Sequence, residues 1–402
     1  MLKKDNFFKN YFINLSKYNK NLKKTKKVFS SFIVDLKNNQ IPLLKSYEKN
    51  YEFDFSATTV KKFSKYRNIV VIGMGGSILG TKSIYSFLKK RIKKEVFFFD
   101  NLDLNLSLKY KKIKNLKNSC FIIVSKSGDT LETITNLGTI FSENLLKNKL
   151  IIITEITDNA LMAIANKYNA EIIEHKKFIG GRYSVLSETG MFPAALMGLN
   201  LMKFKNLKRL INNKNFISSL IQNVASIYTL NSKKINNSVI FNYDSSLNDL
   251  GYWYQQLVAE SLGKQGKGIN PILSFGPKDH HSLLQLYLDG PKDKFFTFFN
   301  SSKRENKLKV ARGIIPNNMG FLINKNLEFI INAQCNATKN IFKLKKIPFR
   351  QITFNKKNED ELGEIFTFFV LETILLSRLM NINPFDQPAV EQVKIETKRF
   401  LR

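Results

Sequence analysis

The sequence predicts an α/β protein with two mainly parallel β-sheets, each covered by helices on both faces. From Asn68 onward, short apolar runs alternate with helical patterns, which is typical of strand–helix–strand units. The apolar runs are continuous, as in strands that are buried on both faces. A second series of the same kind follows the polar stretch near residue 215, and 402 residues are enough for two cores of ordinary size.

The segment before the first strand, residues 1–60, is expected to be mostly helical and rich in lysine. Residues 1–16 read as an amphipathic helix with Phe8, Phe12 and Leu15 on one side. They lack the uninterrupted apolar core and the small-residue cleavage site of a secretion signal. We therefore expect no export signal at this end.

The first unit is expected at residues 61–215 and the second at residues 216–382, followed by a C-terminal turn and helix over 383–402. In the first unit we expect strands at Ile69–Ile72, Val96–Phe99, Phe121–Val124, Leu150–Thr154 and Glu171–Glu174, and helices at Thr81–Lys90, Leu131–Leu146, Ala160–Lys167 and Met191–Leu201. In the second we expect strands at Ser238–Asn242, Phe295–Phe299 and Phe349–Phe354, and a long apolar helix at Leu362–Met380. Both units carry candidate site residues, so we expect the site to lie between them.

The net charge of +32, from 64 basic and 32 acidic residues, raises the question of a nucleic-acid partner. The lysines are spread over the whole length and do not gather in one arm beside aromatic residues. The chain is also rich in Asn, Ile and Phe, which share A+T-rich codons with Lys, so codon bias accounts for most of the charge. We expect no nucleic-acid function, although the positive field would attract an anionic substrate.

The compartment is predicted from apolar runs and cysteines. No apolar run reaches the roughly 18 residues of a membrane span. Cys120 and Cys335 are the only two cysteines and lie far apart in the sequence, which is typical of buried thiols in a reducing compartment. We therefore expect a cytoplasmic protein without a membrane partner.

The stretch from Phe121 to Thr133 is the most informative one. An apolar β-branched run leads into a loop that contains Ser125, Lys126, Ser127 and Thr130, and a helical pattern begins at Leu131. The free N–H groups of a helix start and its dipole favour an anion. Hydroxyls and a cation at this position suit a phosphate group, although a single Ser or Thr here would serve equally well as a helix cap.

A glycine turn, Gly73-Met-Gly-Gly-Ser-Ile-Leu-Gly80, follows the first strand and opens a helix. It half resembles a dinucleotide fingerprint, with Asp100 at the end of the next strand, but Ile78 occupies the third glycine position. It also half resembles a Walker A loop, but Thr81 stands where the lysine is needed. What is left is a second anion-binding turn with Gly76 and Ser77, or a turn that only needs its glycines for geometry.

Arg182 follows Gly180 and Gly181 between a strand and an apolar helix. The two glycines allow the backbone to pass close to a ligand, and the guanidinium offers a fixed fork of donors to an oxyanion. The alternative is an arginine that merely ties down a loop. Both interpretations stay open at this level.

Glu260 lies one helical turn after Gln256, on the same face of a predicted helix. Apolar neighbours would raise the pKa of its carboxyl group, which suits a general base. Taken alone, the residue reads equally as a solvated surface acid.

The remaining candidates are two histidines and the C-terminal segment. His280 and His281 are adjacent and cannot share one helix face, so one is expected to be catalytic and the other a bystander. No Cys or carboxylate lies at a ligand spacing, so no metal site is expected. Near the end, Gln387 and Lys394 lie seven residues apart along one face of a helix that begins near Pro388.

Together these motifs resemble the phosphoglucose isomerase family, in the family's order and over nearly the whole chain from Val70 to Lys394. The most specific are the run Phe178-Ile-Gly-Gly-Arg-Tyr-Ser-Val-Leu-Ser187 and the Gln-x-x-x-Glu-Ser run at Gln256–Ser261. The resemblance implies two sugar-isomerase domains and interconversion of glucose 6-phosphate and fructose 6-phosphate in glycolysis and gluconeogenesis, without metal or organic cofactor. The length resembles that of the compact bacterial members.

The resemblance also implies a role for each matched residue. Glu260 resembles the base that moves a proton between C2 and C1 through a cis-enediol, and Arg182 the residue that stabilises the enediolate. His281 and Lys394 resemble the pair that opens the sugar ring, and in the family the histidine comes from the neighbouring subunit, which implies a homodimer. The residues implied to bind the hexose phosphate are Gly76, Ser77, Ser125, Lys126, Ser127, Thr130, Gly181, Gln256 and Gln387.

Two residues depart from the pattern. Asp129 places a negative charge inside the expected phosphate loop, so its side chain is expected to point away from the ligand or to cap the helix that follows. Glu188 follows the Gly-Gly-Arg motif where a neutral residue is common, and its role is not evident from the sequence.

Overall fold

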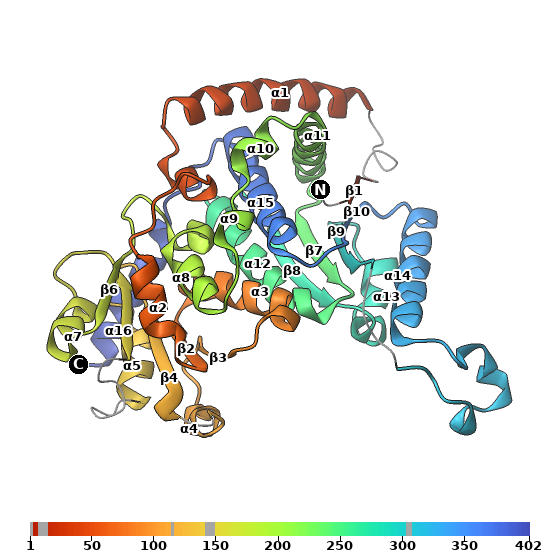
Figure 1. Ribbon diagram of the computed structural model, residues 1–402. Coiled ribbons are helices and arrows are strands. Elements are labelled where there is room, and N and C mark those ends of the chain that lie inside the picture. The colour runs from red at the N-terminus through yellow and green to blue at the C-terminus, as the bar shows by residue number, and fades with distance from the viewer. Residues whose placement is uncertain (1–2, 7–14, 114–115, 141–148, 303–307) are drawn as a thin grey trace.

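The computed structural model describes residues 3–6, 15–113, 116–140, 149–302 and 308–402 (Figure 1). Their strands form two five-stranded sheets with helices packed around them. This architecture confirms the predicted α/β class. The expected unit limits at residues 60, 215 and 382 stay predictions.

The first sheet is parallel throughout, in the order β3-β2-β4-β5-β6. Its strands are β2 (Asn68–Gly73), β3 (Glu95–Phe99), β4 (Ser119–Val124), β5 (Leu150–Thr154) and β6 (Glu171–Glu174). All five predicted strands of this unit are confirmed. Successive residues of β2 enter different hydrophobic clusters, Val71 on one side and Val70 on the other, so both faces are buried and the apolar run has to be continuous.

Helices cover both faces of this sheet: α2 (Ala57–Ser64), α3 (Leu79–Leu88), α4 (Leu106–Lys111), α5 (Leu131–Ile140), α7 (Ala160–Tyr168) and α8 (Glu188–Leu196). Two short helices follow, α9 (Leu201–Phe204), which packs against α15 (Glu359–Met380), and α10 (Leu207–Ile211), which packs against α11 (Lys214–Asn231). The helix predicted over 131–146 is described to Ile140, and residues 141–148 lie outside the described part of the chain. The helix predicted over 191–201 is wrong at its end, because Gly198 adopts a φ of +81° after Leu196 and Asn200 begins a new short helix.

The second sheet has the order β1-β10-β9-β7-β8. Its strands are β1 (Lys3–Asn6), β7 (Asn237–Asn242), β8 (Asn270–Phe275), β9 (Lys294–Ser301) and β10 (Phe349–Phe354). The three predicted strands are confirmed. β8 contains Pro271 and lies at an edge, where a missing N–H is tolerated.

The prediction of a helix over residues 1–16 is wrong for Lys3–Asn6, because these residues pair antiparallel with β10. Cross-strand hydrogen bonds decide the conformation of this polar segment, which has no apolar pattern of its own. Phe8 and Phe12 lie outside the described residues.

The remaining helices are α1 (Leu15–Lys37), α11 (Lys214–Asn231), α12 (Asn248–Leu262), α13 (Leu284–Asp289), α14 (Leu327–Leu344), α15 (Glu359–Met380) and α16 (Glu391–Phe400). In Figure 1, α1 lies across the end of α11 at one side of the molecule. α15 is buried along almost its entire length, as its continuous apolar sequence predicts. None of the helices described is both long and apolar enough to cross a membrane.

The two sheets are joined through α3 and α12, which pack against each other. Lys82 on α3 lies 2.5 Å from Asp100, at the end of β3, and 3.7 Å from Asp249, at the start of α12. Asp100 thus forms an ion pair with Lys82. The acidic residue that would bind the ribose in a dinucleotide fingerprint is therefore already engaged. The same packing brings the end of α12 to the loops of the first sheet.

Candidate active site

The site lies where the order of the first sheet reverses. The chain runs from β2 to its neighbour β3 on one side, and then crosses to β4 on the other side of β2. In open parallel sheets, ligands bind beyond the carboxyl ends of the strands at such a switch point. The loops after β2 and β4 are the glycine turn and the 125–130 loop. The sheet topology alone therefore indicates that both loops lie at a ligand-binding position.

The glycine turn after β2 is shaped by close backbone contact. Gly75 has a φ of +52°, which favours glycine, and a Cβ there would lie 2.6 Å from Gln256 Nε2. A Cβ on Gly76 would lie 2.2 Å from the carbonyl carbon of Gly181. The Ser184 hydroxyl donates to the Gly76 carbonyl at 3.3 Å. The turn Gly75–Ser77 therefore packs in direct backbone contact with the loop that carries Arg182.

The 125–130 loop precedes α5 and is built around two hydroxyls. Ser125 Oγ and Thr130 Oγ1 lie 2.7 Å apart, and Gly128 adopts a φ of +72° that lets the chain turn between them. Ser127 is exposed, and its Oγ accepts weakly from the Asp129 N–H at 3.4 Å. Three hydroxyls thus surround the first turn of a ten-residue helix.

The charged side chains of this loop are turned to neighbouring segments. Lys126 Nζ donates to the Lys177 carbonyl at 2.8 Å and lies 3.5 Å from Glu155. The Asp129 carboxylate accepts from the Ala160 N–H at 2.9 Å, at the start of α7. Asp129 therefore caps α7, and not the helix that follows its own loop, as one of the two expectations had it.

Arg182 lies in the turn Gly181–Leu186 after β6, and its side chain is only 3% exposed. Its Nε donates to Ser261 at 3.0 Å, and Nη1 donates to Gln387 Oε1 at 2.8 Å and to Glu260 Oε2 at 3.2 Å. Nη2 donates to the carbonyls of residues 384 and 386. Every guanidinium nitrogen is engaged, so the group is held in one orientation.

Glu260 is held from two sides near the end of α12. One carboxylate oxygen accepts from Arg182, and the other accepts from Gln256 Nε2 at 2.9 Å. The side chain is 30% exposed, so it stays accessible from solvent. The apolar residues of the same helix, Trp253 and Leu257 among them, are buried in the core and do not surround the carboxylate.

Three residues that the sequence analysis did not single out complete this cluster. The Tyr183 hydroxyl lies 2.8 Å from Ser261 Oγ and donates to the Pro384 carbonyl at 2.9 Å. Lys264 Nζ donates to the Asp386 carbonyl at 2.6 Å and pairs with its carboxylate at 2.7 Å. Tyr183 and Ser261 each follow a predicted site residue directly and lie in the two most specific motifs, which is the signal that could have identified them.

The two candidate histidines lie in the turn Lys278–His281 after β8, and the hydrogen bonds of His280 go to other residues than those of this cluster. His280 Nε2 lies 2.6 Å from the Tyr243 hydroxyl and 3.2 Å from Thr338 Oγ1, and burial lowers the pKa of its imidazole. His281 is exposed. His280 is thus a structural residue, and His281 is the histidine that is free to reach a ligand or another chain.

Lys394 also lies outside the cluster. It is exposed on α16 and pairs with Glu391 at 3.0 Å. Every residue of α16 is exposed. The structure therefore brings together Arg182, Glu260, Gln256 and Gln387 with the glycine turn, and leaves His281 and Lys394 at the surface of the single chain.

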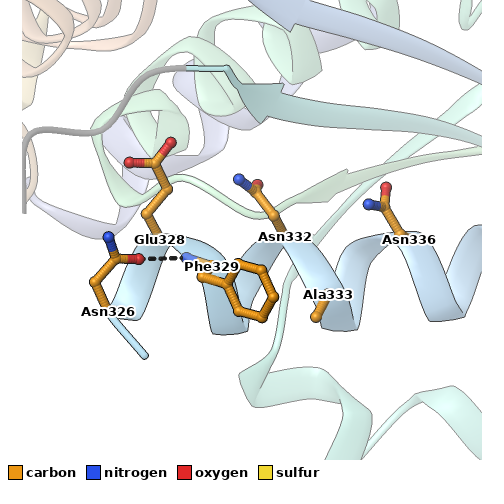
Figure 2. A pocket seen from close by; sticks show the side chains of 6 residues that line it. All are labelled: Asn326, Glu328, Phe329, Asn332, Ala333 and Asn336. Atoms are coloured by element: carbon orange, nitrogen blue, oxygen red, sulfur yellow. Dashed lines mark hydrogen bonds between the residues drawn. The ribbon is translucent and has the colours of Figure 1, made fainter. Parts of the chain in front are cut away.

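Figure 2 shows a pocket on the outer side of α14 that contains none of the predicted site residues. Three of its six lining residues are asparagines, and Asn326 caps the helix by accepting from the Phe329 N–H at 2.8 Å. Within the described ranges, no group of three or more His, Cys, Asp or Glu side chains could hold a metal ion.

Comparisons with known proteins identify the family of the chain. The family model described as phosphoglucose isomerase matches residues 38–278. A glucose-6-phosphate isomerase from Methanocaldococcus jannaschii is 35% identical over 85% of this chain and 86% of its own length. One from Campylobacter jejuni is 31% identical over 83% of this chain and 85% of its own length.

Two solved structures share the fold. A hypothetical protein from Thermus thermophilus has a TM-score of 0.80 at 22% identity, with all of both chains covered. A glucose-6-phosphate isomerase from Chlamydia trachomatis has a TM-score of 0.70 at 19% identity, over 86% of this chain and 72% of that one. Fold, site motifs and sequence relatives agree, and the chain belongs to the phosphoglucose isomerase family of enzymes.

Proposed function

We propose that the protein interconverts glucose 6-phosphate and fructose 6-phosphate, as a cytoplasmic enzyme of glycolysis and gluconeogenesis. The observation that carries the proposal is the Arg182–Glu260 pair: a partly exposed carboxylate held 3.2 Å from a buried guanidinium, beside the switch point of a parallel sheet. Isomerisation between adjacent carbons needs a base that both removes and returns a proton, and a fixed positive charge for the intermediate.

In this mechanism, Glu260 removes the proton from C2 of the open-chain aldose and returns it to C1. The C1 carbonyl oxygen gains a proton, the C2 hydroxyl loses one, and a cis-enediol lies between the two sugars. Arg182 stabilises the negative charge on the enediolate oxygens. Its guanidinium is anchored to Ser261 and Gln387, so its orientation needs no change during the reaction.

The phosphate group is assigned to the 125–130 loop. The hydroxyls of Ser125, Ser127 and Thr130 and the first turn of α5 supply donors to an anion. Lys126 would have to leave the Lys177 carbonyl and Glu155 to contact the phosphate directly. Gly76, Ser77 and Gly181 are assigned to contacts with the sugar; Gly76 and Gly181 meet directly before Arg182, where a Cβ on Gly76 would lie 2.2 Å from the Gly181 carbonyl carbon.

The functional unit is proposed to be a homodimer in which the partner subunit's His281 opens the sugar ring together with Lys394. His281 is exposed, as is Lys394, so both are accessible to a second chain. α16 and its flanking residues expose apolar side chains that a subunit interface would bury. They are Val390, Val393, Ile395, Phe400 and Leu401.

The deciding experiment is a coupled assay of the purified protein with fructose 6-phosphate, in which glucose 6-phosphate formation is followed in the presence of EDTA. Turnover supports the isomerase. Turnover of mannose 6-phosphate but not of glucose 6-phosphate would indicate another substrate. Binding of fructose 6-phosphate in a thermal-shift test without any turnover would indicate a sugar-phosphate-binding regulator instead.

The dimer is tested by mixing two inactive variants, Glu260→Gln and His281→Ala, after they have been unfolded and refolded together. If each site combines Glu260 of one chain with the partner subunit's His281, random pairing restores about a quarter of wild-type activity. If both residues act within one chain, the mixture stays inactive and the shared site is excluded.

A further inference from the structure

Glu188 is a buried carboxylate that the proposed mechanism does not use. It begins α8, directly after the loop of residues 180–187 that carries Arg182, and it is 0% exposed. Burial raises the pKa of its carboxyl group, and hydrogen bonds from Tyr51 and Asp54 act in the opposite direction. A carboxylate in this position is tolerated only if its oxygens are well satisfied.

Its partners come from the N-terminal strap, defined here as residues 46–54. The Tyr51 hydroxyl lies 2.9 Å from both carboxylate oxygens, and the Asp54 N–H donates to one of them at 3.2 Å. The strap and the carboxylate are more than 130 residues apart in the sequence. Glu188 is therefore the point at which the strap is attached to the start of α8.

The strap touches the Arg182 loop at one further point, and the end of β6 before the loop at another. The Tyr47 hydroxyl donates to the Tyr183 carbonyl at 3.1 Å, next to Arg182 itself. The Asp54 carboxylate accepts from the Glu174 N–H at the end of β6. The loop is thus held by the strap before, within and after its turn, and Glu188 supplies the last of these attachments.

A buried lysine, Lys205, contacts three residues of the strap. Lys205 is 0% exposed, and its Nζ donates to the Ser46 carbonyl at 2.8 Å. The ammonium lies 4.3 Å from the ring centroid of Tyr51 and 4.1 Å from that of Phe53, a cation–π arrangement. Burial lowers the pKa of Lys205 to about 7, and the nearby Glu188 opposes this change. Tyr51 is fixed between Lys205 on its ring and Glu188 on its hydroxyl.

The geometry points to Glu188 as a positioning residue for the proposed isomerisation: through Tyr51 and Asp54 it fixes the strap, and the strap holds the loop that aims Arg182 at Glu260. The inference rests on the proposed function for its kinetic effect. The phosphate-binding hydroxyls lie on a different loop with its own hydrogen bonds. The proposal therefore expects turnover to fall while substrate affinity is kept.

The test compares kcat and KM for fructose 6-phosphate in Glu188→Ala, Glu188→Gln and Tyr51→Phe, at a temperature where all are folded. Misplacing a stabilising charge by about 1 Å lowers kcat by about 10- to 100-fold, so Glu188→Ala and Tyr51→Phe should lose that much with KM within about 3-fold. Glu188→Gln keeps an oxygen for Tyr51 or Asp54, and should stay within about 5-fold of the wild-type kcat.

The matched control is Glu361→Ala. Glu361 is also a buried carboxylate, and it accepts from the N–H groups of residues 355–357, beside the second sheet. It should lower the melting temperature without changing kcat or KM. An unchanged kcat in folded Glu188→Ala, or a loss that Glu361→Ala reproduces, overturns the inference.

A readout without turnover separates this inference from the proposed function. In Tyr51→Phe, amide hydrogen exchange should become faster in residues 181–187 and stay the same in residues 126–131. If the wild-type enzyme fails to convert fructose 6-phosphate, the proposed function falls, and this exchange pattern still decides whether the strap fixes the Arg182 loop. If Tyr51→Phe changes the exchange rate of residues 181–187 no more than that of residues 126–131, such a role is excluded.

Discussion

Gly76 and Gly181 meet through their backbones, so closely that a Cβ on Gly76 would lie 2.2 Å from the Gly181 carbonyl carbon. The two residues belong to different motifs, one after β2 and one after β6. Their contact links the glycine turn to the Arg182 loop. Glycine at position 76 is therefore required by packing, whatever contact the residue makes with a sugar.

Gly76→Ala is expected to damage both stability and turnover. The methyl group would meet backbone atoms that cannot move independently, and overpacking of this kind costs about 1 to 3 kcal/mol. Thermal unfolding and the fructose 6-phosphate assay measure the two effects. The control is Gly138→Ala in α5, where a Cβ meets nothing within 4 Å. That change should stabilise by about 0.5 to 1 kcal/mol, because alanine is the better helix former. If Gly76→Ala changes neither the stability nor the turnover, the two backbones can move apart and the close contact is not required.

Glu260→Gln is expected to lower kcat by about three to four orders of magnitude, because the amide cannot act as the base. The single amide oxygen of the glutamine can still accept from Arg182, so the fold and substrate binding should persist. Steady-state kinetics and a thermal-shift titration with fructose 6-phosphate check both parts. Glu95→Gln, an exposed carboxylate at the start of β3, serves as the charge-matched control. Turnover close to that of Glu95→Gln would remove Glu260 from the mechanism.

Asp129 allows the helix cap and the charge to be separated. Asp129→Asn keeps an oxygen for the Ala160 N–H and removes a negative charge beside the expected phosphate site, so KM for fructose 6-phosphate should fall about 2- to 3-fold. Asp129→Ala also removes the cap, and should lower stability by about 1 kcal/mol. Asp158→Asn, exposed in the loop after β5, controls for charge alone. If it lowers KM equally, the effect of Asp129 is not local.

Asp244 is expected to make stability depend on acid pH. Burial would raise the pKa of its carboxyl group, but Lys357, at 2.6 Å, and the hydroxyls of Ser301 and Ser246 outweigh it and hold the pKa at about 2. A depressed pKa stabilises the fold fully above the unfolded value near 4, and the contribution disappears as the pH falls through about 2. Its size is about 2 kcal/mol.

Asp244→Asn should therefore lower the melting temperature at pH 7, and the difference from wild type should shrink as the pH falls from 4 toward 2. Differential scanning fluorimetry over this range measures both. Asp289→Asn, exposed on α13, should show no such pH dependence. A difference that grows toward low pH would contradict the assigned direction of the pKa shift.

Much of the first sheet could be predicted because its strands are buried on both faces. Short runs of consecutive Ile, Val and Phe are typical of strands that are buried on both faces. β2, β4 and β5 are buried at every residue. β1 and β8 could not be found in the same way. The polar run Lys3–Asn6 becomes a strand only through its pairing with β10, and a proline in β8 argues against a strand except at an edge.

The site was predictable as a set of motifs, but not as a set of contacts. The sequence identifies Arg182, Glu260 and Gln387, and their meeting depends on how α12 and the turn at residues 384–387 pack on the first sheet. Asp129 finds its partner 31 residues away, and Glu188 finds Tyr51 137 residues away. Local patterns do not contain such pairings, so the roles of both acids could only be seen in three dimensions.

The pairing of β1 with β10 has a consequence for protein synthesis. Lys3 lies opposite Thr353, so this strand is synthesised 350 residues before the partner with which it pairs. At about 5 to 20 residues per second, this interval is roughly 20 to 70 seconds. A segment that must stay unpaired for so long benefits from the sequence Lys-Lys-Asp-Asn, whose charges discourage pairing with the strand edges of other nascent chains.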